Sequence, residues 1–195
     1  MKIFDISQEL LSCKVYEGDP KPKIETHKSM NSGDLYNLSA LSLCLHNGTH
    51  IDAPRHFIKD GMTVEEIPLS TLVGVCYVAE HQGNVTASDA LEILNRAQRE
   101  NAAERILLKG NLTVTEEAAK EFAKAEILLL GNESQSVGPE NAPMAVHLAL
   151  LAKGVILLEG IVLRDVKKGK YILNAAPLKV KGAEGSPCRA WLMEM

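Results

Sequence analysis

The sequence predicts an α/β fold built on a mixed sheet, and three observations lead to this class. Short apolar runs alternate with helical patterns between about residues 72 and 159, which is typical of βαβ units around parallel strands. The preceding part of the chain consists of extended segments separated by turns, which predicts antiparallel strands in the amino-terminal part. The chain has 195 residues, 46% of them hydrophobic, and no linker, so we expect a single domain over residues 1–195.

The amino-terminal part is expected to be extended. Glu17–Pro20 and Lys59–Gly61 have the composition of turns. His27 stands alone and is interpreted as a surface or hydrogen-bonding histidine. The odd-numbered leucines of residues 41–45 are expected to face the core. The expected strands are residues 2–7, 23–28, 38–52 (one strand or a strand pair) and 72–79.

The second half is expected to alternate helices with buried strands. Thr86, with Asp89 three residues later, marks a helix that continues to about Glu100. Thr113 or Thr115 caps a second helix, which ends near Lys124. A third helix is predicted from Asn141, with Pro143 close behind, through Ala152 to a stop at Gly154. The strands expected between and after these helices are residues 105–109, 126–131 and 155–159.

Composition excludes several classes of function. The formal net charge is -4, lysines and arginines are scattered, and there are one Trp, four Tyr and three Phe, so no nucleic-acid surface is expected. The longest apolar runs, such as Ile127–Leu130, are too short to span a bilayer. An aspartate at position 5 interrupts any signal-peptide core. The cysteines are far apart, and this spacing predicts reduced and mostly buried thiols. We therefore expect a cytoplasmic protein. The cysteines are Cys13, Cys44, Cys76 and Cys188.

The stretch from His46 to His56 concentrates side chains that can bind a metal. It contains three of the six histidines and an aspartate. On a helix Asp52 would point away from His50. On an extended chain every second side chain points to the same side, so the even-numbered residues His46, His50, Asp52 and His56 would share one face. This spacing favours a strand. On that face Gly48 leaves room for an ion or substrate, and a proline after Asp52 can turn His56 back over the site.

The chemistry of these side chains indicates a hydrolytic metal site. Imidazole nitrogens and carboxylate oxygens suit zinc, and also manganese or iron, better than calcium or magnesium. The alternative is a loop of solvated histidines, which four ligand-type residues in register disfavour. Cys44 shares the parity of His46 and is a possible ligand, although packing is the simpler interpretation of its side chain.

Glu159 and His147 are further candidates. Glu159 ends a buried strand, where it is either a surface group or a ligand whose charge a cation neutralises. His147 lies in an otherwise apolar helix, on the side of Met144 and Leu151, which we expect to face the core. It is either a core histidine bonded to a backbone carbonyl or a second ligand beside Glu159.

The chain resembles the cyclase-like metal-dependent hydrolases, the family of bacterial kynurenine formamidase and isatin hydrolase. The resemblance covers nearly the whole chain, and its central motif is His46-x-Gly48-Thr49-His50-x-Asp52-Ala53-Pro54-x-His56-Phe57. Further matches are Gly18-Asp19-Pro20, Ser136-Val137, His147-x-x-Leu150-Leu151, Leu158-Glu159-Gly160, Ala176-Pro177-Leu178-Lys179 and Gly182-x-x-Gly185-Ser186-Pro187-x-Arg189-Ala190.

The resemblance implies a fold of swivelling β/α/β character and a division of roles within the site. His46, His50 and Asp52 would be ligands of one divalent metal, Zn²⁺ first and Mn²⁺ second. Asp52 would bridge to a second ion held by His147 and Glu159. His56 would be the catalytic general acid/base. The family also implies a homodimer or homotetramer whose neighbouring subunit closes the pocket.

The implied activity is hydrolysis of the carbon–nitrogen bond of an N-formyl or cyclic amide, in the manner of an arylformamidase. The chain departs from the family pattern at Asn132-Glu133 and at Gly138, where relatives commonly have aspartate. Lys109-Gly110-Asn111 also leads almost directly into the next helix, where many relatives have a longer insertion. The alternative is therefore a non-catalytic metal-binding or interaction protein that keeps the fold.

Overall fold

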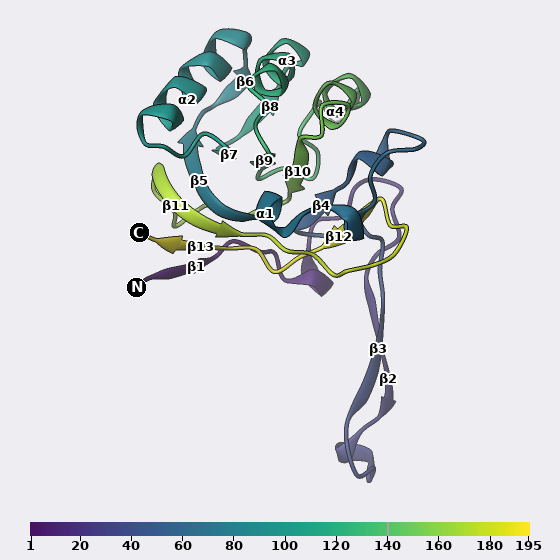
Figure 1. The fold of residues 1–195 in the computed structure, drawn as a ribbon. Coiled ribbons are helices and arrows are strands. Elements are labelled where there is room, and N and C mark those ends of the chain that lie inside the picture. Colours follow the sequence, from purple (N-terminus) through teal and green to yellow (C-terminus); the bar gives the residue numbers. More distant parts are fainter. Residues whose placement is uncertain (140) are drawn as a thin grey trace.

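The computed structural model describes residues 1–139 and 141–195, and one curled mixed sheet organises them (Figure 1). Within these residues nine strands form this sheet. Their order across it is β1 (Ile3–Asp5), β13 (Trp191–Glu194), β11 (Gly169–Asn174), β5 (Val73–Glu80), β7 (Arg105–Lys109), β9 (Leu129–Asn132), β10 (Ile156–Glu159), β4 (His50–Asp52) and β12 (Gly185–Pro187).

The centre of the sheet is parallel and both of its sides are antiparallel. Neighbours among β5, β7, β9 and β10 run parallel, and the remaining pairs of the sheet run antiparallel. Parallel neighbours require crossover connections, and helices supply them here. These helices are α2 (Ala87–Arg99), α3 (Glu116–Lys124) and α4 (Met144–Leu151). The predicted α/β class with a mixed sheet is confirmed.

The helices cover one face of the parallel strands (Figure 1). Along β7, Ile106 and Leu108 pack in the cluster that contains the helices, while Leu107 packs in the cluster on the other face. Strands buried on both faces are apolar at every position, which explains the continuous apolar runs of the sequence. A short parallel pair, β6 (Gly83–Val85) with β8 (Leu112–Val114), precedes α2 and α3.

Most predicted helices and strands are present, but several of their bounds differ from the prediction. Thr86 and Thr115 cap α2 and α3 as expected. The strand predicted from residue 126 begins only at Leu129, because Glu126 has a left-handed φ of 55° where the chain leaves α3. The helix predicted from Asn141 begins at Met144.

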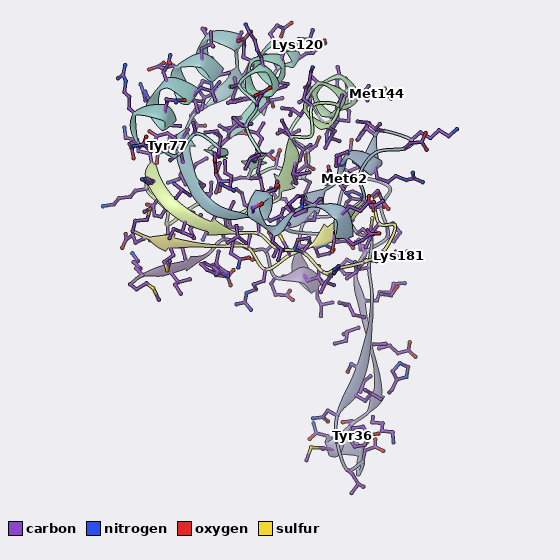
Figure 2. All side chains as sticks on the ribbon, in the orientation of Figure 1. Tyr36, Met62, Tyr77, Lys120, Met144 and Lys181 are labelled. Carbon is purple, nitrogen blue, oxygen red and sulfur yellow. The ribbon has the colours of Figure 1, made fainter. Side chains whose placement is uncertain are left out.

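A hairpin of β2 (Lys23–Lys28) and β3 (Leu38–Ser42) projects from the body of the molecule, and we call residues 23–42 the arm (Figure 1). Every residue of both strands is exposed. Tyr36 lies at its outer end (Figure 2). His27 is exposed, as predicted. The prediction that the odd-numbered leucines of residues 41–45 face the core was wrong for Leu41, which is 50% exposed because the arm has no layer packed against it. Leu45, beyond the arm, is partly buried against the core as predicted.

Two further expectations concern the cysteines and membrane spans. All four cysteines are free, as predicted; Cys76 is fully buried and the other three are partly buried, with Cys188 packed against the core. In the described part of the chain, no helix has the length and apolar character needed to cross a bilayer. The short helix α1 (Leu69–Leu72) and the 3₁₀ helices at Leu10–Ser12, Met30–Ser32, Pro54–His56 and Val64–Glu66 complete the fold.

Candidate metal centre

Antiparallel pairing of β4 with β10 brings three candidate residues together. In this register Glu159 lies opposite His50, and Asp52 follows His50 two residues later on the same face. Ile51, between them, points to the opposite face and is fully buried. The alternation predicted for the motif therefore holds for His50 and Asp52.

The ends of the motif are not in the strand. The predicted strand 38–52 divides into β3 and β4, and His46 lies in the turn between them. Asn47 closes this turn, because its side chain accepts the backbone N–H of Cys44 at 2.9 Å. His56 ends the 3₁₀ helix that Pro54 begins, so the chain turns back over the site as predicted. A continuous strand would have separated these two histidines, whereas their rings stack with centroids 4.1 Å apart.

Gly48 has a different role from the one predicted. Its φ is +64°, and an added Cβ would lie 3.1 Å from the Cβ of Cys13. Cys13 therefore occupies the space that we expected an ion or substrate to use. The carbonyl oxygen of Gly48 instead lies 3.0 Å from His50 Nδ1 and accepts the side-chain amide of Gln135 at 3.1 Å.

α4 contributes His147, which is buried beside Asp52 and Glu159. Leu151 is buried on this helix as expected, but Met144 is 61% exposed (Figure 2). The prediction for Met144 was wrong because it lies in the first turn, at the open end of α4.

Two sets of donor atoms share the Asp52 carboxylate. Asp52 Oδ1 lies 2.8 Å from His46 Nδ1 and 3.4 Å from His50 Nε2. Asp52 Oδ2 lies 3.7 Å from His147 Nε2, which is itself 3.4 Å from Glu159 Oε1. In each set, His46–His50–Asp52 and Asp52–His147–Glu159, the candidate donor atoms lie within 4.8 Å of one another. The structure thus brings together all five residues that the sequence suggested as ligands.

Neighbouring carbonyl groups orient two of the imidazoles. His50 Nδ1 lies 3.0 Å from the carbonyl oxygen of Gly48, and His147 Nδ1 lies 2.9 Å from that of Pro143. A carbonyl oxygen can only accept, so Nδ1 carries the proton and Nε2 of the neutral ring is free to bind a cation. Such outer bonds are typical of metal-binding histidines.

Burial of the two carboxylates favours a bound cation. Asp52 and Glu159 are fully enclosed, and an unpaired buried charge is costly. Asp52 Oδ2 and His46 Nε2 have no hydrogen-bond partner among the described residues. A divalent cation would satisfy these atoms and offset the negative charge, so the residues present fit such an ion.

The two carboxylates differ in acidity. Burial acts to raise the pKa of Asp52, but contacts with His46 and His50 outweigh it and hold that pKa well below its usual value. Burial, followed by the charge of Asp52, raises the pKa of Glu159. Burial also acts to lower the pKa of His50, whereas the hydrogen bond and charge of Asp52 raise it overall.

His56 differs from the other histidines of the site. Its Nε2 lies 4.0 Å from Asp52 Oδ2, and the ring is partly open to solvent. Burial lowers its pKa to about 4, despite the opposing charge of Asp52. At neutral pH His56 is therefore an uncharged imidazole that can accept a proton.

A cavity of about 260 Å³ opens onto these side chains. Its further lining residues were not predicted as site residues, although Asp19, Phe57 and Ser136 lie in segments that match the family pattern. They are Tyr16, Asp19, Phe57, Gln135, Ser136 and Pro143. A larger groove of about 680 Å³ lies between residues 5–10 and 176–189 and contains none of the donor residues.

Two neighbours of the site also bear on the predictions. Glu184, in the turn before β12, lies 3.5 Å from His46 Nε2, and no pattern in the sequence indicated it. Cys44, the possible extra ligand, donates its thiol to Asp19 at 3.7 Å and belongs to neither donor set. Burial raises the pKa of this thiol, which keeps it protonated.

Comparison with known proteins places this arrangement in a family. The model of the family Cyclase, described as "Putative cyclase", matches residues 4–139. A kynurenine formamidase of Erythrobacter litoralis is 31% identical, over 100% of this chain and 94% of its own length. A solved structure described as a predicted metal-dependent hydrolase from Bacillus stearothermophilus is 28% identical, with a TM-score of 0.81 over 98% of this chain and 97% of that one.

The fold is also similar to that of proteins with lower sequence identity. Isatin hydrolase A from Labrenzia aggregata is 23% identical, and its TM-score is 0.84 over 98% of this chain and 93% of that chain. Because the family model matches well over half of the residues, the chain belongs to the Cyclase family.

Proposed function

We propose that this protein is a metal-dependent hydrolase that cleaves the carbon–nitrogen bond of an N-formyl or cyclic amide, in the manner of an arylformamidase. The observation that carries the proposal is the Asp52 carboxylate, which faces two donor sets and has His56 beside it. The kynurenine formamidases among its relatives align over the full chain and support the same class of reaction. The cavity of about 260 Å³ can hold a small amide.

We further propose that His46, His50 and Asp52 hold one divalent ion and that Asp52, His147 and Glu159 hold a second. Three imidazoles and two carboxylates favour Zn²⁺, with Mn²⁺ as the next choice. When bound, such an ion polarises a carbonyl group and increases the acidity of water. The buried carboxylates orient the imidazoles and offset the charge of the ions.

His56 is the proposed general acid/base. Nε2 of the uncharged ring can accept a proton from water and deliver it to the departing amine nitrogen. The ring is the most accessible of the four histidines in the site, so a substrate can reach it. Its stacking on His46 and edge contact with Phe57 hold it over the cavity.

Metal analysis combined with hydrolysis tests the proposal. Protein purified without chelator should contain one or two equivalents of Zn²⁺ or Mn²⁺ per chain. It should hydrolyse N-formylkynurenine or simple formanilides, and chelation should abolish this activity. His56→Ala should keep its metal and lose about 10²–10⁴-fold in kcat. Bound metal without hydrolysis of any formyl or cyclic amide would favour the non-catalytic alternative.

We also propose that the protein is a homodimer or homotetramer in which a second copy covers the arm. A two-stranded hairpin is marginally stable alone in water, and exposed apolar patches are typical of interfaces. The arm leads directly into the turn that carries His46, so a partner there would lie next to the site. Its exposed apolar side chains are Ile24, Met30, Leu35, Tyr36, Leu38 and Leu41.

Charge substitutions on the arm test this assembly. Ile24→Glu combined with Leu41→Glu should convert the protein to monomers in sedimentation or light-scattering measurements. Leu69→Glu, also at an exposed leucine but outside the arm, is the control and should leave the assembly unchanged. A wild-type protein that is monomeric at micromolar concentration would contradict the proposal.

The four free thiols fit the reducing cytoplasm, which we propose as the compartment of this protein.

A further inference from the structure

Ser136 lies in the connection between β9 and α4 and lines the same cavity as His56, His147 and Glu159. The residue is only 5% exposed, and its hydroxyl has no hydrogen-bond partner among the described residues. A buried hydroxyl without a partner costs about 1–3 kcal/mol. A group that enters the cavity from solution can supply that partner.

The backbone around Ser136 is held on both sides. Its carbonyl oxygen accepts the side-chain amide of Asn132 at 3.1 Å and also the hydroxyl of Ser134. The N–H of the next residue, Val137, donates to Glu159 Oε1 at 2.7 Å. These bonds fix the position of Ser136 next to the second donor set, while its hydroxyl stays uncommitted.

Two other polar side chains of the lining, Gln135 and Asp19, already make hydrogen bonds. The amide nitrogen of Gln135 donates to the carbonyl oxygens of Lys14 and Gly48. Gln135 Oε1 also lacks a hydrogen-bond partner, but it lies against the backbone of Gly160: a Cβ added at Gly160 would be 2.6 Å from this oxygen. Asp19 accepts the thiol of Cys44. Ser136 therefore offers the uncommitted hydroxyl beside the ligand carboxylates.

We propose that the Ser136 hydroxyl accepts a hydrogen bond from the N–H of the scissile amide, an inference that rests on the proposed hydrolase function. A secondary amide presents one carbonyl oxygen and one N–H. The carbonyl group is the part that a cation polarises, which leaves the N–H to be satisfied by the protein. Ser136 thereby selects formamides and lactam-type amides with a free N–H over their N-alkylated analogues.

Matched substrates test this selection. Metal-loaded wild type and Ser136→Ala would be compared on formanilide and N-methylformanilide by steady-state kinetics. Ser136→Ala should lower kcat/KM for formanilide about tenfold, because one hydrogen bond is lost, and change that for N-methylformanilide less than about twofold. Ser136→Thr, which keeps the hydroxyl, should restore most of the loss. Metal content of each variant is measured alongside.

Ser70→Ala is the control, because Ser70 is an exposed serine of α1 that neither lines the cavity nor contacts Ser136. It should affect both substrates equally. Equal losses on both substrates in Ser136→Ala, or no loss on either, would overturn the role of Ser136 and leave the proposed function intact. A metal-loaded wild type that cleaves neither formanilide nor any other formyl or cyclic amide would overturn both proposals.

Discussion

Asp52 is the residue on which the site depends most. Each of its oxygens faces a different pair of candidate ligands, and the carboxylate is fully buried. His46 and His50 hold its pKa well below the usual range, whereas burial raises that of Glu159. The two carboxylates therefore differ in position: Asp52 is shared by both donor sets, whereas Glu159 belongs only to the second.

A pair of isosteric substitutions tests this difference. Asp52→Asn removes the charge that both donor sets share, so we expect less than about half an equivalent of metal per chain after desalting. Glu159→Gln disturbs only the second set, and its side-chain carbonyl can still accept the N–H of Val137. That variant should retain about one equivalent. Elemental analysis gives the metal content, and retention of metal by Asp52→Asn would contradict a shared ligand.

Among the elements, β12 supports the site without contributing a donor. Gly185 pairs with Asp52 of β4, and the ring of His46 lies directly over it. A Cβ added at Gly185 would lie 2.5 Å from His46 Cε1, and its three nearest atoms all belong to that ring. The absence of a side chain here lets the turn before β4 bring His46 to Asp52.

Gly185→Ala should consequently displace His46. The ring is held by its 2.8 Å contact with Asp52, so it cannot move aside without loosening the first donor set. We expect metal affinity of that set to fall about tenfold or more, as when an outer-shell partner is lost. Metal titration measures this, and the second set serves as the internal control. Wild-type affinity at both sets would show that His46 accommodates the methyl group without cost.

At the scale of the whole molecule, the two ends of the chain lie side by side at one edge of the sheet (Figure 1). β1 pairs with β13, and Asp5 accepts two hydrogen bonds from Arg189, at 2.7 and 2.9 Å. Burial acts to raise the pKa of Asp5, but the bonds from Arg189 and Ser7 outweigh it and lower the pKa overall. This pair joins the first strand to the segment before the last.

The lowered pKa predicts how this pair depends on pH. A carboxyl group with a depressed folded-state pKa stabilises the fold above its unfolded pKa, about 3.9, and loses that effect as pH falls through the folded value. Because both side chains are largely exposed, Asp5→Asn should cost only about 0.5 kcal/mol at pH 7. Urea unfolding of both proteins at pH 7 and pH 3 should give a smaller difference at pH 3. A larger difference at pH 3 would contradict the prediction.

Local pattern was sufficient to predict the main helices and strands between residues 72 and 159 and the candidate site residues, but it did not predict β11, β12 and β13, which follow them. Apolar runs are set by burial of strands on both faces, and helix caps such as Thr86 act within one turn, so both are visible in the sequence. The motif around His50 and Asp52 is equally local, because alternation along one strand places them on one face. Their roles as ligands, with His46, His147 and Glu159, and that of His56 in catalysis, stay predictions.

Only the tertiary structure decided how these residues meet. The pairing of β4 with β10 joins positions more than a hundred residues apart, and the packing of α4 adds His147, which no local pattern specifies. The turn that carries His46 depends on Asn47, and the neighbours Ser136 and Glu184 come from connections without periodicity. The arm was misread because burial depends on what packs against a strand, and alternation alone does not reveal whether a second layer exists.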